Sequence, residues 1–187
     1  MSTAPTRTLI VGSGAREHAL AWKLAGEPGM NDVVVAPGSA AMAAEPRVRQ
    51  MRDVEPHDGA AVVAAAREVA AELVVIGPEA PLAAGVADAL RDASIAVFGP
   101  SLAAARIETS KAFCHEVAEA AGVRMARART FAEGEEAAAR AWVAELGAAG
   151  DGVVLKQDGL AAGKGVAVYD DAGLALDHVA SYLDRRG

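Results

Sequence analysis

Short runs of valine, isoleucine and leucine alternate along the chain with longer segments whose apolar residues recur at helical spacing. An apolar run that stops at glycine or proline is typical of a buried strand. The pattern predicts strands over residues 8–11, 33–35, 73–76 and 95–98, with a further short strand near 48–51. Helical segments separate these runs, so we predict βαβ units and a parallel sheet.

The predicted helices cover residues 17–25, 58–71 and 82–91, the second of them capped by Asp58. Strand after strand ends in Gly or Gly-Pro. In a parallel sheet these ends share the carboxyl edge, which is where open α/β sheets bind their ligands. We therefore expect the functional residues of this part of the chain to follow its strands.

The pattern changes near residue 122. Helices are predicted over 110–121, 133–146 and 173–186, and two strands over 153–156 and 166–169 flank a glycine-rich loop. A short loop between two strands predicts a hairpin rather than a crossover. We therefore predict an α/β chain with two parts: a Rossmann-like parallel-sheet domain over 1–122 and a small α+β domain over 123–187.

Composition and charge narrow the function classes. The 187 residues carry 18 lysines and arginines against 25 aspartates and glutamates, a net charge of −7, which argues against nucleic acid or an anionic membrane as partner. The single cysteine excludes an internal disulfide framework and a cysteine-rich zinc site. No apolar run approaches the roughly 20 residues that span a bilayer. We expect a cytoplasmic monomer that acts on small molecules.

The first candidate site follows the first strand and opens the first helix. Gly12 and Gly14 let backbone amides approach an anion at a helix N-terminus. A dinucleotide fingerprint requires a third glycine where Glu17 stands and an acid after the next strand, which is missing, so NAD binding is disfavoured. Arg16 suggests a phosphate monoester, and Glu17 of the same turn is a further candidate substrate contact. The alternative is a tight strand–helix turn with a surface arginine.

Further candidates lie at the ends of neighbouring strands. Pro37 and Gly38 follow the second strand, and Gly77, Pro78 and Glu79 follow the strand over 73–76. The Glu79 carboxylate suits a sugar hydroxyl or an amine, or else it is a solvated loop acid. His18 is either a ligand contact or an ordinary residue of the first helical turn.

The glycine-rich hairpin is the sharper signal, and Lys156 precedes it. Its candidate residues are Asp158, Gly159, Leu160, Ala161, Ala162, Gly163, Lys164 and Gly165. It is not a Walker A loop, because its glycine spacing is one residue short and Gly165 replaces the serine or threonine that holds magnesium. A glycine loop between strands with lysines nearby suits a lid over nucleotide phosphates. The alternative is a flexible hairpin with surface lysines.

In combination and in this order, the motifs resemble the N-terminal part of the glycinamide ribonucleotide synthetase family, whose members are ATP-grasp enzymes. The matching stretches are 12–23, 35–38, 75–82, 98–100, 110–113 and 158–166. The resemblance implies a pre-ATP-grasp domain that binds phosphoribosylamine, followed by an ATP-grasp lid. The resemblance also implies that Lys111 and Lys156 contact ATP. Without the resemblance, we would interpret Lys111 as a solvated lysine.

The resemblance implies that ATP phosphorylates the carboxylate of glycine and that the amine of phosphoribosylamine then attacks the acyl phosphate. This chemistry needs charge neutralisation and exclusion of water, and we assign no catalytic residue. ATP with Mg²⁺ or Mn²⁺ is the implied cofactor. We expect the residues that bind this metal to lie beyond residue 187. We therefore predict that the chain is a fragment that is inactive alone.

Two other readings stay open. One is a binding module for a sugar phosphate or a nucleotide without catalysis. The other is a different ATP-grasp ligase, such as the formate-using or carboxylating purine enzymes or biotin carboxylase, for which we expect a different glycine loop. A nicotinamide oxidoreductase is the weakest option, because Glu17 replaces the third glycine of the dinucleotide fingerprint and no acid follows the second strand.

Overall fold

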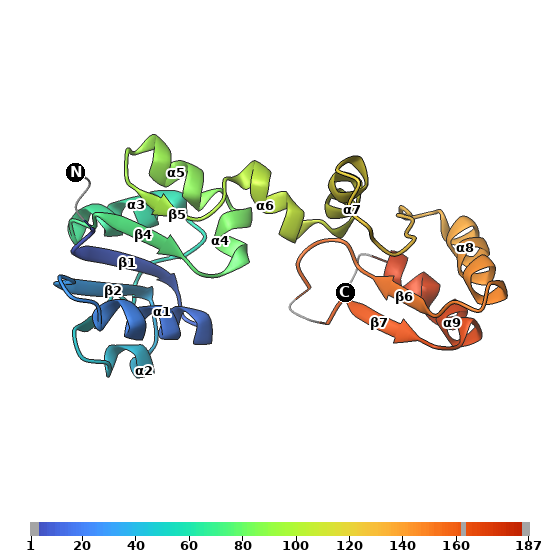
Figure 1. The fold of residues 1–187 in the computed structure, drawn as a ribbon, viewed down its shortest axis with the longest axis horizontal. Coiled ribbons are helices and arrows are strands. Elements are labelled where there is room, and N and C mark those ends of the chain that lie inside the picture. Colours follow the sequence, from blue (N-terminus) through green and yellow to red (C-terminus); the bar gives the residue numbers. More distant parts are fainter. Residues whose placement is uncertain (1–3, 162–163, 185–187) are drawn as a thin grey trace. The chain divides into compact units, whose positions relative to one another are not determined.

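The computed structural model describes residues 4–161 and 164–184 (Figure 1). The chain divides into two compact units between Arg106 and Ile107. The sequence analysis placed the domain boundary after residue 122. In the structure the helix that follows Ser110 belongs to the second unit, because the first turn of this helix is hydrogen-bonded to Asp158.

A parallel five-stranded sheet forms the first unit. Its strands are β1 (Arg7–Gly12), β2 (Asp32–Pro37), β3 (Val48–Gln50), β4 (Leu73–Ile76) and β5 (Val97–Phe98). Their spatial order is β3-β2-β1-β4-β5. All four neighbouring pairs are parallel, so the predicted parallel sheet is confirmed.

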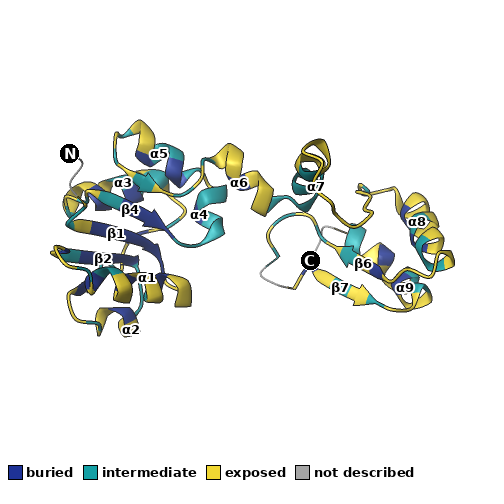
Figure 2. Ribbon diagram, in the orientation of Figure 1, coloured by how far each residue is buried: buried dark blue, intermediate teal, exposed yellow. Residues whose placement is uncertain are grey.

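Helices cover both faces of this sheet, which is why its central strands are apolar on both sides. On one face, Leu9 and Val11 pack with α3 (Gly59–Glu68) and α5 (Val86–Asp92). On the other, Ile10 packs with α1 (Ala15–Ala25) and α2 (Ala40–Ala43). Figure 2 shows β1, β2 and β4 as the buried centre of this unit. The alternation along β1 therefore produces a doubly wound α/β unit.

The chain order reverses between β1 and β4. From β1 the chain runs outward through β2 to β3, and it then returns to build β4 and β5 on the opposite side. Gly12 ends β1, and Gly77 follows the last residue of β4. In open α/β sheets this reversal leaves a crevice at the carboxyl edge.

One predicted helix is wrong. The segment 82–91 is not continuous but contains the end of α4 (Glu79–Ala83) and most of α5. Gly85, with a φ of +79°, separates the two helices. Since left-handed backbone breaks an α-helix, the apolar spacing alone could not reveal this break. The last helix that begins in this unit is α6 (Leu102–Thr109).

The second unit has a smaller core. It contains α7 (Lys111–Ala120), α8 (Glu136–Ala148), β6 (Val153–Lys156), β7 (Val166–Tyr169) and α9 (Ala172–Leu183). The two strands are antiparallel, as the hairpin prediction required. Val153 packs with Val143 of α8 and Val179 of α9, so both helices cover one face of the hairpin. None of the helices in the described ranges 4–161 and 164–184 has the length and apolar character to cross a bilayer.

Candidate functional sites in the two units

An open cleft of about 410 Å³ lies at the carboxyl edge of the first unit. Its lining residues are Gly12, Ser13, Gly14, Ala15, Arg16, Glu17, Pro37, Pro56, His57, Pro78, Ala80 and Pro81. These come from the loops after β1, β2, β3 and β4, and from the first turns of α1 and α4. The cleft thus occupies the crevice that the reversal of strand order creates.

The Glu17 side chain lies buried beside this cleft, with 2% of its surface exposed. One carboxylate oxygen, Oε2, accepts a hydrogen bond from the backbone N–H of Gly14 at 2.7 Å. The other, Oε1, is buried without a hydrogen-bond partner among the described residues. A Cβ added to Gly12 would lie 2.7 Å from Glu17 Cγ, and a Cβ added to Gly77 would lie 2.6 Å from Glu17 Cδ. These two glycines therefore make room for a carboxylate of this chain.

This arrangement changes what the glycine turn offers to a ligand. The N–H of Gly14 is bonded to Glu17, so this donor is not available to a ligand. Arg16 adds a positive side chain to the lining of the same turn. The side chain of Arg16 is 67% exposed, and its guanidinium donates to Glu79 Oε2 at 2.8 Å. That hydrogen bond, before any other cause, lowers the pKa of Glu79.

The other predicted residues of the first unit lie at different distances from the cleft. Gly38 adjoins it through a hydrogen bond from its N–H to the Gly12 carbonyl, and Gly77 makes the same contact to Val11. The His18 ring is bonded to Glu45 at 2.9 Å and is not among the lining residues.

Six lining residues were not named as candidates from the sequence, namely Ser13, Ala15, Pro56, His57, Ala80 and Pro81. Ser13 and Ala15 stand within the glycine turn after β1, Pro56 and His57 belong to the loop after β3, and Ala80 and Pro81 lie in α4. The available signal was topological, because every loop that follows a strand of a parallel sheet emerges at the same edge.

In the second unit, one face of the hairpin is left open by the helices. Val154 lies opposite Val168, and Lys156 lies opposite Val166, all four on the same face. Val168 is 71% exposed, and the other two valines are nearly half exposed. An apolar surface with a lysine at its end suits a flat, partly apolar ligand that carries negative charge. The valines were not predicted, although the alternation along each strand could have identified them.

The glycine loop begins on the N-terminus of α7. Asp158 Oδ1 accepts hydrogen bonds from the backbone N–H groups of Lys111 at 2.6 Å and Ala112 at 3.2 Å. Its Oδ2 accepts the Ser110 hydroxyl at 3.1 Å. The ammonium of Lys111 donates to the Gly159 carbonyl at 2.8 Å. Partial burial raises the pKa of Asp158, but these hydrogen bonds outweigh it and hold the pKa below its usual value.

The rest of the loop is closed at its base by a hydrogen bond from the Gln157 N–H to the Gly165 carbonyl at 2.8 Å. Lys164 donates its N–H to the Ala161 carbonyl, and Leu160 is exposed. The predicted residues Ala162 and Gly163 lie outside the described residues. Lys156, Lys111 and the start of the loop are therefore held within the same unit.

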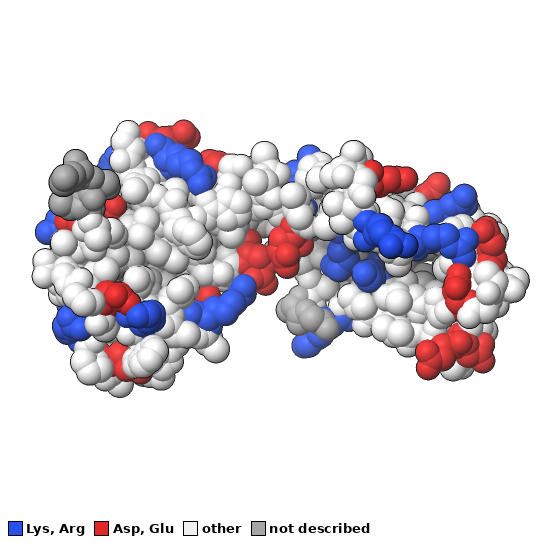
Figure 3. All heavy atoms as spheres, viewed as in Figure 1, with Lys and Arg blue, Asp and Glu red and all other residues white. Residues whose placement is uncertain are grey.

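Basic side chains also gather over the segment that joins α7 to α8 (Figure 3). There Arg127 and Arg129 lie against the Trp142 ring, at 5.5 and 4.5 Å from its centroid. Arg127 is also paired with Asp151 at 2.7 Å. Within residues 4–161 and 164–184, no group of three or more His, Cys, Asp and Glu side chains has the arrangement of a metal site.

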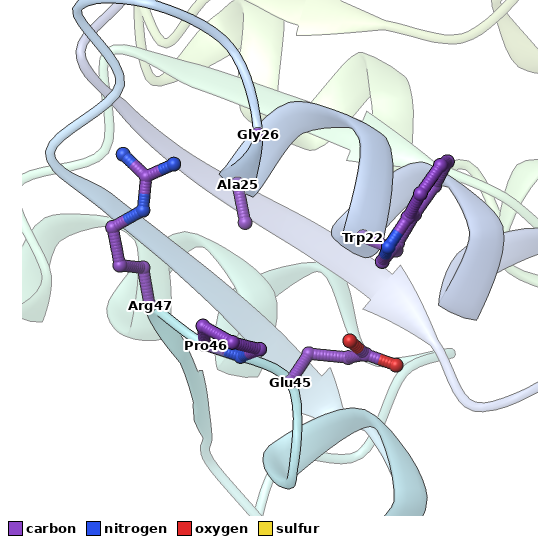
Figure 4. A pocket seen from close by; sticks show the side chains of 6 residues that line it. All are labelled: Trp22, Ala25, Gly26, Glu45, Pro46 and Arg47. Atoms are coloured by element: carbon purple, nitrogen blue, oxygen red, sulfur yellow. The ribbon is translucent and has the colours of Figure 1, made fainter.

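A smaller hollow of about 120 Å³ lies near the end of α1 (Figure 4). Trp22, Ala25 and Gly26 form one wall, and residues 45–47 form the other. Both walls lie towards the amino edge of the sheet, because one is formed by the last turns and the C-cap of α1 and the other directly precedes β3. We assign this hollow no function, since ligands of such sheets bind at the opposite edge.

Comparison with known families identifies the family to which the chain belongs. The sequence model of the phosphoribosylglycinamide synthetase N domain matches residues 6–108, and that of the ATP-grasp (A) domain of the same synthetase matches residues 109–187. The chain belongs to the phosphoribosylglycinamide synthetase family. The two matched domains meet close to the division between the two units of the structure. The resemblance stated from the motifs is thereby confirmed.

Members of the phosphoribosylglycinamide synthetase family are similar to the chain over almost all of its length. The phosphoribosylamine–glycine ligase of Streptomyces coelicolor is 49% identical over 179 residues, which are 96% of this chain and 41% of the relative. The crystal structure of the Thermotoga maritima ligase is 28% identical with a TM-score of 0.64, and the match covers 94% of this chain and 39% of that chain. The chain thus spans about two fifths of the length of these relatives.

The fold extends beyond the family. The biotin carboxylase domain of the Hydrogenobacter thermophilus 2-oxoglutarate carboxylase, solved in complex with MgADP, has a TM-score of 0.71 at 18% identity. That match covers 97% of this chain and 41% of that chain. At this identity the likeness shows a shared fold, while the ATP-grasp character that the sequence analysis expected is shown by the match to the ATP-grasp (A) domain.

Proposed function

We propose that this chain is the part of a phosphoribosylamine–glycine ligase that binds phosphoribosylamine in its first unit and ATP with Mg²⁺ in its second. The whole enzyme joins glycine to 5-phosphoribosylamine in purine synthesis, with ADP and phosphate as the other products. Both family matches, and the names of relatives 49–50% identical, support this assignment. For this reason we prefer the assignment to a phosphoribosylamine–glycine ligase over a different ATP-grasp ligase and over a non-catalytic binding module.

The cleft of the first unit suits a sugar phosphate that also carries an amine. Arg16 supplies the positive charge for the phosphate, while Glu17 and Glu79 place acceptors near the turn that follows each central strand. Acceptors of this kind bind hydroxyl and amine groups. We therefore assign the phosphate to the arginine side of the cleft and the donor groups of the ligand to the carboxylate side.

The second unit suits a nucleoside triphosphate. The exposed valines of the β6–β7 face offer an apolar surface to a purine base, and Lys156 stands at the end of that surface. Lys111 and the beginning of the glycine loop lie together on α7. The two ammonium groups would neutralise phosphate charge as it builds on transfer to the glycine carboxylate.

The chemistry consists of two balanced steps. The glycine carboxylate attacks the γ-phosphorus of ATP, the bond to the bridging oxygen breaks, and glycyl phosphate and ADP form. The amine of phosphoribosylamine then attacks the acyl carbon, and inorganic phosphate leaves as the amine loses a proton. Because water would hydrolyse glycyl phosphate, the enzyme has to exclude it during both steps, which is the task we assign to the glycine loop.

The observation that carries the proposal is the Arg16 guanidinium, which is 67% exposed and belongs to a residue that lines the cleft at the carboxyl edge of the sheet. Replacing Arg16 with alanine is expected to weaken ribose 5-phosphate binding to this chain about tenfold, because one charge-assisted contact to phosphate is lost. Isothermal titration with ribose 5-phosphate measures the effect.

Arg7→Ala is the matched control for this titration. Arg7 begins β1 at the amino edge and is paired with Glu72 at 2.9 Å, so it is an arginine in the same unit with the same kind of partner. Its removal should leave the affinity for ribose 5-phosphate unchanged. Equal affinity of the wild type and of Arg16→Ala would show that the phosphate does not bind at this turn, and the proposed substrate site would then be wrong.

A further inference from the structure

The N-terminus of α7 is already occupied by a carboxylate of the chain itself. The first turn of a helix attracts anions because its N–H groups are free and the helix dipole is positive there. In this chain Asp158 takes the N–H groups of both Lys111 and Ala112. A phosphate group therefore cannot use these two donors while Asp158 holds them, and the charge of Asp158 would repel it.

The same contact places the Lys111 ammonium. The backbone of Lys111 is bonded to Asp158, and its Nζ is bonded to the carbonyl of the very next residue, Gly159. A carbonyl takes one of the three ammonium donors and leaves the positive charge uncompensated. Gly159 has a φ of +96°, a left-handed conformation that suits glycine and turns the chain directly after the anchoring residue.

We propose that Asp158 is a positioning residue, which fixes the Lys111 ammonium and the start of the glycine loop for nucleotide binding without contacting the nucleotide. The inference rests on the proposed nucleotide site of the second unit. It assigns Asp158 a role distinct from the direct nucleotide contact that the sequence analysis gave it as a residue of the glycine hairpin. It also accounts for an acidic residue at the start of a loop whose ligand is strongly negative.

Two substitutions separate anchoring from charge. Asp158→Ala removes the anchor and should weaken the binding of ATP with Mg²⁺ to this chain about tenfold, because Lys111 and the loop lose their fixed position. Asp158→Asn removes the negative charge but keeps a carbonyl acceptor for the N–H groups of α7. Its affinity for ATP should stay within about threefold of the wild type.

Asp171→Ala is the matched control. Asp171 is an aspartate of the same unit that caps α9, and its Oδ1 accepts the N–H of Gly173 at 2.7 Å. Asp171→Ala therefore changes the net charge as much as Asp158→Ala does and also removes contacts at a helix N-terminus. The thermal stability of the two variants should fall by a similar amount. The affinity of Asp171→Ala for ATP should be that of the wild type, because Asp171 touches neither Lys111 nor the glycine loop in the contacts described above.

A double variant tests whether Asp158 acts through Lys111. Lys111→Met combined with Asp158→Ala should lose less affinity for ATP than the two single losses added together, since the part of the anchor's effect that acts through Lys111 is then already gone. Fully additive losses, an equal gain of affinity in both Asp158 variants, or an unchanged affinity of Asp158→Ala would each overturn the positioning role. Absence of saturable ATP binding by the wild type would instead overturn the proposed nucleotide site itself.

Discussion

Replacing Gly77 with alanine is expected to destabilise the first unit by about 3 kcal/mol, a large effect for a single methyl group. The new Cβ would overlap the Glu17 side chain, whose Cδ lies 2.6 Å from the position of that atom. Glu17 cannot move aside, because it is buried and its carboxylate is bonded to Gly14. Thermal unfolding followed by Trp22 fluorescence, in a Trp142→Phe background, reports on this unit.

Two further variants test whether the loss of stability comes from the overlap with Glu17. Gly26→Ala is the control in the same unit, because its Cβ would lie 3.3 Å from the nearest atom, the Lys23 carbonyl oxygen. The Gly77→Ala substitution should cost less than about 1 kcal/mol when Glu17 is also alanine, since the overlapping side chain is then gone. An equal cost in both backgrounds would show that Gly77 is needed for some reason other than the buried carboxylate.

Replacing Lys156 with methionine is expected to weaken the binding of ATP with Mg²⁺ to this chain about 10- to 100-fold. The substitution keeps the unbranched apolar stem beside Val166 and removes only the positive charge at the end of the open hairpin face. Since the side chain is exposed, the stability of the second unit should hardly change. Isothermal titration with ATP, together with thermal unfolding, measures the two properties separately.

Lys23→Met serves as the control for this substitution, because Lys23 is an exposed lysine of α1 paired with Glu27 on the first unit. It should leave ATP binding unchanged. If Lys23→Met weakened ATP binding as much as Lys156→Met does, the effect would come from net charge. The open face of the hairpin would then not be the nucleotide site.

The sequence was sufficient for the elements whose signal is local. A run such as residues 8–11 is apolar on both sides because helices cover both faces of its sheet, so periodicity identified the parallel sheet. The break at Gly85 was missed, because a left-handed φ depends on the packing of α4 and α5 and leaves no mark on the apolar spacing. The hairpin was recognised because glycines separate its two short strands.

The sites were predictable as motifs but not as contacts. Gly12 and Gly77 are 65 positions apart in the sequence, and only the strand order brings both of them against Glu17. Likewise, Asp158 meets the start of α7 across 47 positions. Sequence reasoning interpreted these glycines and this aspartate as ligand contacts. The structure shows in addition what they do for the chain itself, namely to house one carboxylate and to anchor one loop.

An assay of a hybrid enzyme tests directly whether this chain is part of a phosphoribosylamine–glycine ligase. The hybrid joins residues 1–187 to the part of the Streptomyces coelicolor ligase that lies beyond its matched segment, a graft that the 49% identity supports. We predict that the hybrid consumes ATP only when glycine and phosphoribosylamine are both present and forms one glycinamide ribonucleotide per ATP. A folded hybrid that binds ATP and ribose 5-phosphate but forms no glycinamide ribonucleotide, while the unaltered Streptomyces enzyme does, would contradict this prediction.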